Sequence, residues 1–455
     1  MAVTMDSLPA RYAPVRQVMS GFGRIGSSVA AVVSLPGIGR LQELVAGAPA
    51  GLIARGSGLS YGDAALNTDG VVVCPVTAGV INLDADRQTV TATASTTFAE
   101  ILGRIVPAGF ILPVLPGTRH LTVGGAIAAD VHGENHRQSG SLSAWVERVE
   151  LLDGTGELRQ LSLMSDPHGL RATVGGMGLT GVVLSATIRL RRIETSLVRV
   201  TSRRAADLDT TLSMLESGTA QYAMAWVDAA APGASLGRGV VEQADHALPA
   251  EEPGARHELS YRQRRPRRVP AAPVPLITPR AARALGSLRF AVAARERCGL
   301  ADFATFFHRL DAAQGWNHAL GPHGLVRYQF VVPLGAEAVL AQVLASVQRH
   351  RCPPVLAALR RFGIASGGPL SFPLAGWCLV LDIPAGRAQL GALLTGLDMR
   401  VAEAGGRICL AEDARLSRYA LESMYSELPG WQAVKARLDP RGRFQSDLGR
   451  RLGLC

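Results

Sequence analysis

The chain has 455 residues, of which 47% are hydrophobic and 18% charged. This length predicts about two to four folding units, and the composition excludes wholesale disorder. No apolar run predicts a transmembrane helix, and no basic-then-apolar N-terminal segment predicts a secretory signal. The six cysteines are widely spaced without a C-x-x-C pair. That spacing argues against a disulfide scaffold or a thiolate metal site and favours a cytoplasmic location.

The net charge is +10, and arginine carries almost all of the positive charge because Lys435 is the one lysine. A basic surface favours an anionic partner, either a phosphate-bearing ligand or an anionic membrane. Nucleic acid is disfavoured, since aromatic residues make up only 5% and form no ladder with basic residues.

Short elements and glycine-rich loops alternate over the first 194 residues. The pattern predicts helices over 36–50 and 97–110, strands over 51–55, 71–75 and 89–94, a hairpin over 146–162 turning at Asp153-Gly154, and a strand ending near 190. These elements predict an α+β layer.

The pattern changes after Glu194. Strands over 327–333 and 377–384 flank helical periods over 335–350 and 386–404, which predicts a separate lobe: an antiparallel sheet with covering helices. The arginine- and proline-rich stretch 262–280 is typical of a mobile basic loop.

Three glycine-rich segments, 55–63, 116–133 and 173–181, carry the first chemical signal. Glycine lets backbone N–H groups approach a phosphate closely, and successive amides form a cradle for an anion. A Rossmann site would need G-x-G-x-x-G opening a helix with an acid about 20 residues further on, and none of the three segments fits. They therefore predict a pyrophosphate site of another architecture.

Their sequences, R-G-S-G-L-S-Y-G-D (55–63), P-V-L-P-G-T-R-H-L-T-V-G-G-A-I-A (113–128) and V-H-G-E-N-H (131–136), resemble the FAD-binding domain of the vanillyl-alcohol oxidase, or PCMH, type. With A-T-V-G-G-M-G-L-T-G (172–181), Y-Q-F-V-V-P (328–333) and P-L-S-F-P-L-A-G-W (369–377), nearly the whole chain is similar to the decaprenylphosphoryl-ribose oxidase family. That family supplies the flavin subunit of a pair that epimerises ribose to arabinose.

The resemblance implies a two-lobed α+β fold. Residues 1–194, completed by 408–455, would form the PCMH-type FAD-binding domain, and 195–407 the substrate domain. The expected cofactor contacts are Ala54, Arg55, Gly56, Ser57, Gly58, Leu59, Ser60, Tyr61, Pro116, Gly117, Thr118, Thr122, Val123, Gly124, Gly125, Ala128, Ala129, His132, Gly133, Gly178 and Val182. Leu59 stands where some relatives attach FAD through a histidine, so the expected FAD is non-covalent, and no metal is expected.

Tyr61, His132 and Glu412 are the candidate bases, in no firm order. Each has a plainer alternative: Tyr61 could cap a turn, His132 could be a satisfied loop histidine, and Glu412 could be a solvated surface carboxylate. Glu412 stands where the family carries a lysine beside the flavin, which reverses the charge there.

On the substrate side the resemblance implies Trp226, Gln329, Arg360, Val380 and Cys378. Arg360 matches a family lysine and offers a bidentate fork to phosphate. Val380 replaces a family cysteine, and strand alternation leaves Cys378 on the same face.

The expected reaction oxidises a secondary hydroxyl of a sugar or sugar-like substrate to a ketone by hydride transfer to flavin N5, as the oxidative half of an epimerisation completed by a reductase partner. Oxygen or a quinone would reoxidise the flavin. The altered residues favour a soluble sugar, nucleoside or aminocyclitol of secondary metabolism. One alternative is a polyprenyl-phosphate pentose, with the basic loop docked at the inner face of the membrane; another is a flavin-binding scaffold without turnover.

Overall fold

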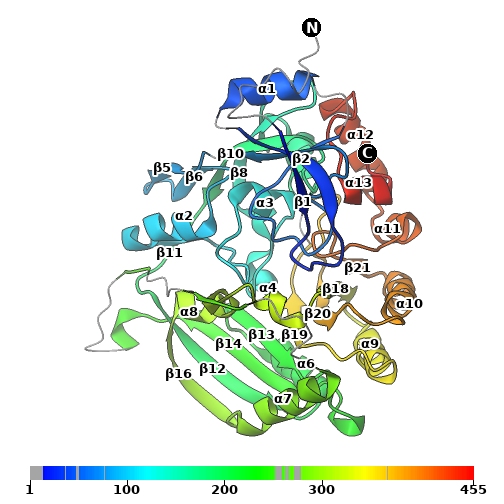
Figure 1. Ribbon diagram of the computed structural model, residues 1–455. Helices are drawn as coiled ribbons and strands as arrows, with labels where there is room; N and C mark the ends of the chain where they lie inside the picture. Colours follow the sequence, from blue (N-terminus) through cyan, green and yellow to red (C-terminus); the bar gives the residue numbers. More distant parts are fainter. Residues whose placement is uncertain are drawn as a thin grey trace.

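The computed structural model describes residues 14–455 except 36, 48–50, 76, 252–258, 262–265, 271–277 and 366. In Figure 1 the blue and cyan elements and the red C-terminal helices form the upper part, and a large green and yellow sheet forms the lower part. The mixed α+β arrangement predicted from the sequence is confirmed.

Two sheets build the upper part. Their strands are β1 (Val15–Met19), β2 (Ser28–Leu35), β3 (Leu52–Ala54), β4 (Val71–Pro75), β5 (Val80–Asp84), β6 (Thr89–Thr93), β8 (Val146–Leu152), β9 (Leu158–Ser162) and β10 (Val182–Arg189). The first sheet has the order β1-β2-β4-β3, with β4 parallel to both of its neighbours. The second has the antiparallel order β5-β6-β10-β8-β9, and the short β7 (Phe110–Ile111) and β11 (Arg191–Arg192) pair separately.

The helices that accompany this part are α1 (Ile38–Gly47), α2 (Phe98–Ile105), α3 (Val123–Ala128), α4 (His136–Ser139), α5 (Pro167–Thr173), α11 (Arg418–Met424), α12 (Leu428–Leu438) and α13 (Asp447–Leu452). Local signals set their ends. Thr97 and Glu100 form a capping box that starts α2, and Gly109 in the left-handed region ends the following 3-10 turn. The helix predicted over 97–110 is therefore present as α2 and this 3-10 turn.

The C-terminal segment returns to the first sheet. Phe444 is fully buried in the core of that sheet, and the N–H of Leu52 donates to the carbonyl of Arg443 at 2.9 Å. The indole N–H of Trp431 on α12 donates to the carbonyl of Ala172 at 2.9 Å. Residues from the two ends of the chain thus build one layer.

The lower part is an antiparallel eight-stranded sheet of order β16-β12-β14-β13-β19-β20-β18-β21. Its strands are β12 (Leu197–Ala205), β13 (Tyr222–Val227), β14 (Gly239–His246), β16 (Glu296–Asp302), β18 (Leu325–Pro333), β19 (Leu356–Phe362), β20 (Gly376–Pro384) and β21 (Arg407–Ile408). The expected domain boundary between residues 407 and 408 falls inside β21.

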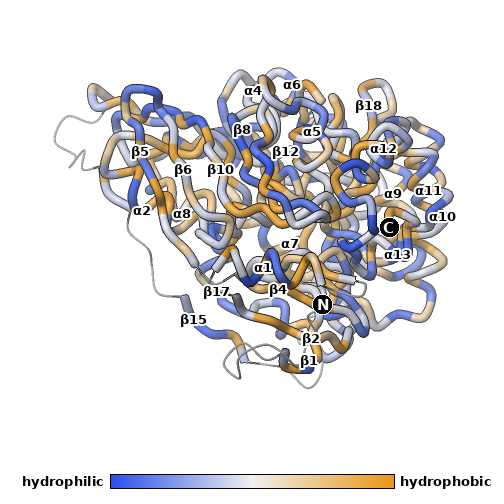
Figure 2. Tube along the Cα trace, turned by 90° about the horizontal axis from the view of Figure 1, so that it is seen from above, coloured by the Kyte–Doolittle hydropathy of each residue, from blue (hydrophilic) through white to orange (hydrophobic). Residues whose placement is uncertain are grey.

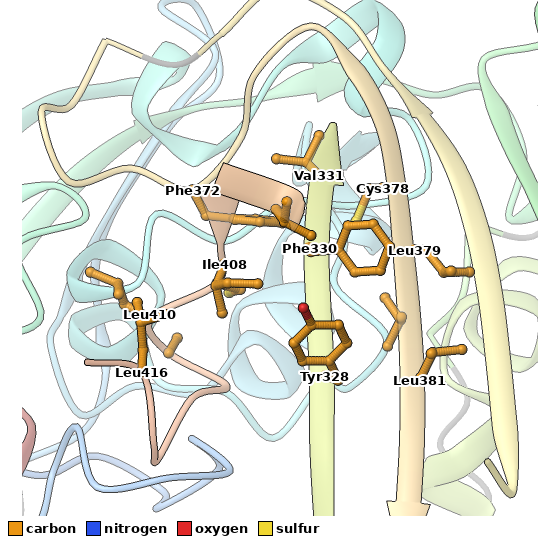
Figure 3. Close-up of a cluster of buried hydrophobic side chains, with 14 of the residues drawn as sticks. Tyr328, Phe330, Val331, Phe372, Cys378, Leu379, Leu381, Ile408, Leu410 and Leu416 are labelled. Carbon is orange, nitrogen blue, oxygen red and sulfur yellow. The ribbon is translucent and has the colours of Figure 1, made fainter. Parts of the chain in front are cut away.

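In the described ranges the helices that accompany this sheet are α6 (Leu208–Ser217), α7 (Pro279–Val292), α8 (Phe303–Phe307), α9 (Ala338–Arg349) and α10 (Leu390–Glu403). Buried residues of α9 and α10 share one hydrophobic cluster with β18, β19 and β20. Figure 3 shows part of that cluster, in which Tyr328 and Phe330 lie between Ile408 on one side and Leu379 on the other.

The predicted basic loop 262–280 needs a correction at its C-terminal end. Residues 262–265 and 271–277 lie outside the described residues, but β15 (Arg267–Arg268) pairs in parallel with β17 (Ala313–Gln314), and α7 begins at Pro279. The Thr278 hydroxyl accepts from the N–H of Ala281, and a cap followed by proline starts a helix. Figure 2 shows β15 as a hydrophilic segment at the margin of the molecule.

Candidate active site

The loop that follows β3 presents open backbone amides. Arg55 anchors the loop, because its guanidinium donates to the carbonyl oxygens of Ala65 and Ser20 at 3.1 and 2.9 Å. Within the described part of the chain, the N–H groups of residues 56–60 have no hydrogen-bond partner. A side-chain carbon on Gly56 would lie 2.2 Å from the hydroxyl of Thr122, so only glycine fits there. Five consecutive amides without a hydrogen-bond partner in the described part of the chain suit a pyrophosphate.

The second glycine segment lies directly against this loop. The Ser57 hydroxyl donates to the carbonyl of His120 at 2.6 Å, and Thr122 caps α3 by accepting from the N–H of Gly125. A side-chain carbon on Gly124 would lie 3.0 Å from the methyl group of Ala94. Gly117 has open space around it. The two segments together fit the elongated phosphate part of a dinucleotide.

Two expected cofactor residues point into the core instead. The side chains of Val123 and Val182 are fully buried, Val182 among the residues that join the first sheet to Phe444. Any contact of these two positions with a ligand is therefore through the main chain. Met177 and Gly178 both have positive φ values, of 54° and 74°, which shape the third segment.

Tyr61 ends the first glycine loop at the junction with the large sheet. Its ring packs on Phe22, with centroids 5.0 Å apart, and the Arg327 guanidinium carbon lies 4.0 Å from the ring centroid. Burial raises the pKa of the phenol well above its usual value, although Arg327 opposes this shift. Tyr61 is therefore a neutral phenol near neutral pH.

His132 is held by the sheet as a neutral imidazole. Gln329 on β18 donates through Nε2 to His132 Nε2 at 2.8 Å, and the same nitrogen lies 3.5 Å from Cys378 Sγ. Burial lowers the pKa of His132 well below its usual value, and the neighbouring His136 and Arg360 lower it further. The Nε2 lone pair of His132 is thus already engaged by an amide.

A buried ion pair stands beside Glu412. Arg327 on β18 forms a two-pronged pair with Asp382 on β20, with Nε–Oδ1 and Nη2–Oδ2 distances of 2.7 and 2.8 Å. Glu412 Oε1 lies 4.0 Å from Arg327 Nη1, and Glu412 Oε2 is a buried oxygen without a hydrogen-bond partner among the described residues. Burial raises the pKa of Glu412 to about 7, with Arg327 acting in the opposite direction. The alternative of a solvated surface carboxylate is wrong, because the side chain is only 21% exposed.

The five expected substrate-side residues share one face of the sheet. Trp226, Ala358, Val380 and Gln329 lie directly opposite one another across β13, β19, β20 and β18, and Arg360 opposite Cys378 forms the next row. Directly paired residues of antiparallel strands project to the same face, so these rows form a single wall.

Arg360 is the unpaired cation of this wall. Across the described ranges it makes no hydrogen bond or ion pair, and its Nε atom is buried without a partner. The carboxyl group of Glu134, in the loop after His132, also has a buried unpartnered oxygen. Burial raises the pKa of Glu134 to about 7, while Arg360 and Arg309 lower it. Unpaired polar groups of both signs line this wall, and they need a polar ligand to satisfy them.

Sequence reasoning missed Arg327, Asp382 and Glu134 as site residues, as well as Arg289. Arg289 projects from α7, and its guanidinium carbon lies 4.4 Å from the Trp226 ring centroid. Strand alternation was the available signal for Arg327, since it lies two residues before Gln329 on the same strand. Arg289 gave no such signal, because no element was predicted over 281–292 and the predicted loop 262–280 covers only the first two residues of α7.

Residues 30–162 match the model of the FAD binding domain family. The protein is therefore an FAD-dependent oxidoreductase with a PCMH-type fold, as predicted, rather than a flavin-binding scaffold. It is 34% identical to decaprenylphosphoryl-beta-D-ribose oxidase of Mycolicibacterium smegmatis, over 96% of this chain and 97% of that protein. The chain belongs to this oxidase family.

Two other proteins are also similar to this chain. A Streptomyces coelicolor protein of the mprA 5′ region, described as uncharacterized, is 42% identical over 77% of this chain and 98% of its own. D-arabinono-1,4-lactone oxidase of Eremothecium gossypii is 29% identical over 30% of this chain and 27% of its own. In the described part of the chain, no helix is long and apolar enough to cross a membrane, and no cluster of side chains could hold a metal ion.

Proposed function

We propose that the protein oxidises a secondary hydroxyl of a sugar or sugar-like substrate to a ketone, and that Glu412 accepts the hydroxyl proton. FAD, when bound, supplies the acceptor of the hydride at N5. The observation that carries the assignment is the partly buried carboxyl of Glu412, whose Oε2 has no hydrogen-bond partner among the described residues, at the place where the glycine loop meets the sheet wall.

Glu412 is better suited to take the proton than the two other candidates. A general base works best when its pKa lies near the operating pH. The pKa of Glu412 is raised to about 7, whereas that of Tyr61 is raised well above 10 and that of His132 falls well below 6.5. Gln329 also occupies the Nε2 lone pair of His132. We therefore assign Tyr61 and His132 to shaping the pocket.

The remaining groups divide between cofactor and substrate. The open amides of residues 56–60 and the segment 116–130 would hold FAD without a covalent link, since Leu59 carries no nucleophile. Gln329 and Trp226 would bound the sugar, and Val380 and Cys378 would supply apolar contact. The Arg360 guanidinium forms no direct ion pair among the described residues and its Nε atom is buried without a hydrogen-bond partner, which supports an anionic substituent on the substrate.

An anaerobic substrate screen tests this function. The purified yellow protein is mixed with sugar alcohols, sugar phosphates, nucleosides and aminocyclitols, and loss of the flavin absorbance is recorded. We expect bleaching with at least one polyol and a ketone as the product. A matched deoxy analogue lacking that hydroxyl should leave the spectrum unchanged. The absence of bleaching with every polyol, in a protein whose flavin is reduced by light and reoxidised by air, would reject the proposal.

A lipid-linked pentose is the second candidate for the substrate, and one observation favours it. Leu285, Leu288 and Val292 on α7 are each more than half exposed, and α7 also places Arg289 over Trp226. An exposed apolar stripe with arginines suits the surface of an anionic bilayer. Sedimentation with anionic vesicles separates the candidates: binding at low salt favours the lipid-linked substrate, and no binding favours a soluble one.

The involvement of a reductase partner is a separate proposal. If a reductase partner completes an epimerisation, this protein alone should yield the ketone and no epimer. Formation of the epimer without a partner would contradict the paired scheme. Measuring oxygen consumption against reduction of a soluble quinone identifies the electron acceptor.

A further inference from the structure

The ion pair behind Glu412 has no role in the proposed function so far. Asp382 is fully buried, and the Arg327 side chain is 18% exposed. The two residues are direct cross-strand partners on β18 and β20. Both prongs of the pair have short distances, which fix the guanidinium plane. Arg327 is thus immobilised at the junction of the two parts of the molecule.

Two groups at that junction depend on the same guanidinium. One face of it covers the Tyr61 ring at 4.0 Å, a cation–π contact that joins the glycine loop to the sheet. Its Nη1 atom is the nearest cation to the Glu412 carboxyl, at 4.0 Å. Among the described residues no hydrogen bond to that carboxyl is found, so its charge depends on its electrostatic surroundings.

Those surroundings come from four elements. β18 contributes Arg327, β20 contributes Asp382 and Cys378, β19 contributes Arg360, and the loop after β3 contributes Tyr61. Cys409, on the same turn as Glu412, is also close enough to interact. Of these groups, Arg327 and Arg360 favour the ionised carboxyl, and Asp382 opposes them.

We propose that Arg327 is the positioning residue of the reaction: clamped by Asp382, it holds Glu412 as the carboxylate that receives the substrate proton and fixes the ring of Tyr61 beside it. This inference rests on the proposed role of Glu412. It adds no covalent step, since the proton passes from the substrate hydroxyl to the carboxylate and Arg327 keeps its own protons.

A spectral pH titration tests this proposal without any substrate. Ionisation of a carboxyl beside the bound flavin should shift the visible spectrum, and Glu412→Gln should remove that transition. Arg327→Gln should move its midpoint upward by about 1–3 pH units, because loss of a cation at this distance favours the protonated acid. Asp382→Asn should move it downward, since an opposing negative charge is lost. Arg327→Lys should restore part of the shift.

The matched control is Arg203→Gln. Arg203 and Glu296 are also direct cross-strand partners in the same sheet, with Nε–Oε1 and Nη2–Oε1 distances of 3.0 and 2.8 Å, but they are exposed. This variant should leave the midpoint unchanged. General damage to the sheet would not move the midpoint in opposite directions in Arg327→Gln and Asp382→Asn.

A midpoint that is the same in Arg327→Gln and Asp382→Asn as in the unmodified protein would overturn the proposal. So would a transition that survives Glu412→Gln. Failure of every polyol to bleach the flavin is a separate result: it would reject the oxidation chemistry while leaving the opposite midpoint shifts as evidence for the electrostatic arrangement.

Discussion

The cofactor side and the substrate side of the site are built by different means. The cofactor side consists of backbone amides on glycine-rich loops, where residues 56–60 offer open N–H groups. The substrate side consists of side chains on one face of an antiparallel sheet, where Trp226, Gln329 and Arg360 are placed by register. A backbone cradle tolerates little change at its glycines, whereas side chains on a fixed sheet can be exchanged singly. The difference explains why the cofactor follows from the sequence more firmly than the substrate.

A larger side chain at Gly56, in the loop whose backbone amides we expect to bind the FAD pyrophosphate, should have the largest effect on FAD binding. In Gly56→Val the new side chain would meet Thr122, whose hydroxyl is committed to capping α3. We expect the folded protein to purify without its yellow colour. Absorbance at the flavin band relative to protein, with circular dichroism to verify folding, measures this.

Gly26→Val is the matched control, because Gly26 is exposed and has open space around it. It should keep a full complement of FAD. A yellow Gly56→Val protein would show that the cofactor is not held at this loop.

Breaking the link between the glycine loop and the turn that carries Glu412 is expected to cost stability. Arg451 on α13 pairs with Asp63 at 2.8 Å and with Asp413 at 3.0 Å, which ties the glycine loop to the turn that carries Glu412. Arg451→Met removes the ion-pair partner of both carboxylates and should lower the free energy of unfolding by about 3 kcal/mol. This is the lower end of the range for buried pairs, since Arg451 is partly exposed.

Urea denaturation measures that loss. Arg418→Met, which removes an exposed pair with Glu422, is the control and should change the free energy of unfolding by less than about 1 kcal/mol. Equal effects of the two substitutions would contradict a structural role for the Arg451 link.

Removing the free cation of the substrate wall should change affinity rather than stability. Arg360→Met loses a charge-assisted hydrogen bond to an anionic substituent, worth about 1.5–3 kcal/mol, or about 10- to 150-fold in kcat/KM. At a pH well above 7, where Glu412 is ionised with or without Arg360, the same variant should oxidise a neutral analogue as well as the unmodified protein does. A uniform loss on charged and neutral substrates would remove Arg360 from substrate recognition.

The smallest effect is expected on the opposite face of the same sheet. Arg203→Gln removes an exposed ion pair with Glu296, so stability should fall by no more than about 1 kcal/mol and kcat/KM should not change. A larger effect on kcat/KM would mean that the two faces of the sheet are coupled.

The sequence predicted the two-part fold because its signals are local. Glycine stops, turn residues and alternating apolar strands identify β3, α2, β18 and β20 directly. Helix α7 was missed because a proline-rich, arginine-rich segment precedes it, and the capping signal at Thr278-Pro279 was outweighed by that composition. The return of Phe444 to the core of the first sheet required long-range packing that local patterns do not encode.

The difference between local signals and long-range packing also applies to the site residues. Tyr61, His132 and Glu412 were identified as candidates, but only the geometry distinguishes them. The ranking of these three residues as proton acceptors depends on the hydrogen bond from Gln329 to His132 and on the ion pair of Arg327 with Glu412. Both contacts join residues more than 80 positions apart. Burial of a carboxyl at such a junction cannot be read from its neighbours in the sequence.

The rate of flavin bleaching by substrate, followed by anaerobic stopped flow across pH in the unmodified protein and in Glu412→Gln, tests the central claim most directly. In the unmodified protein the rate should rise with pH through about 7, as the Glu412 carboxyl loses its proton, and then level off. Glu412→Gln should bind FAD normally, bleach about 10²- to 10⁴-fold more slowly and lose that rise. A Glu412→Gln protein that bleaches at the unmodified rate with the same pH profile would contradict the account.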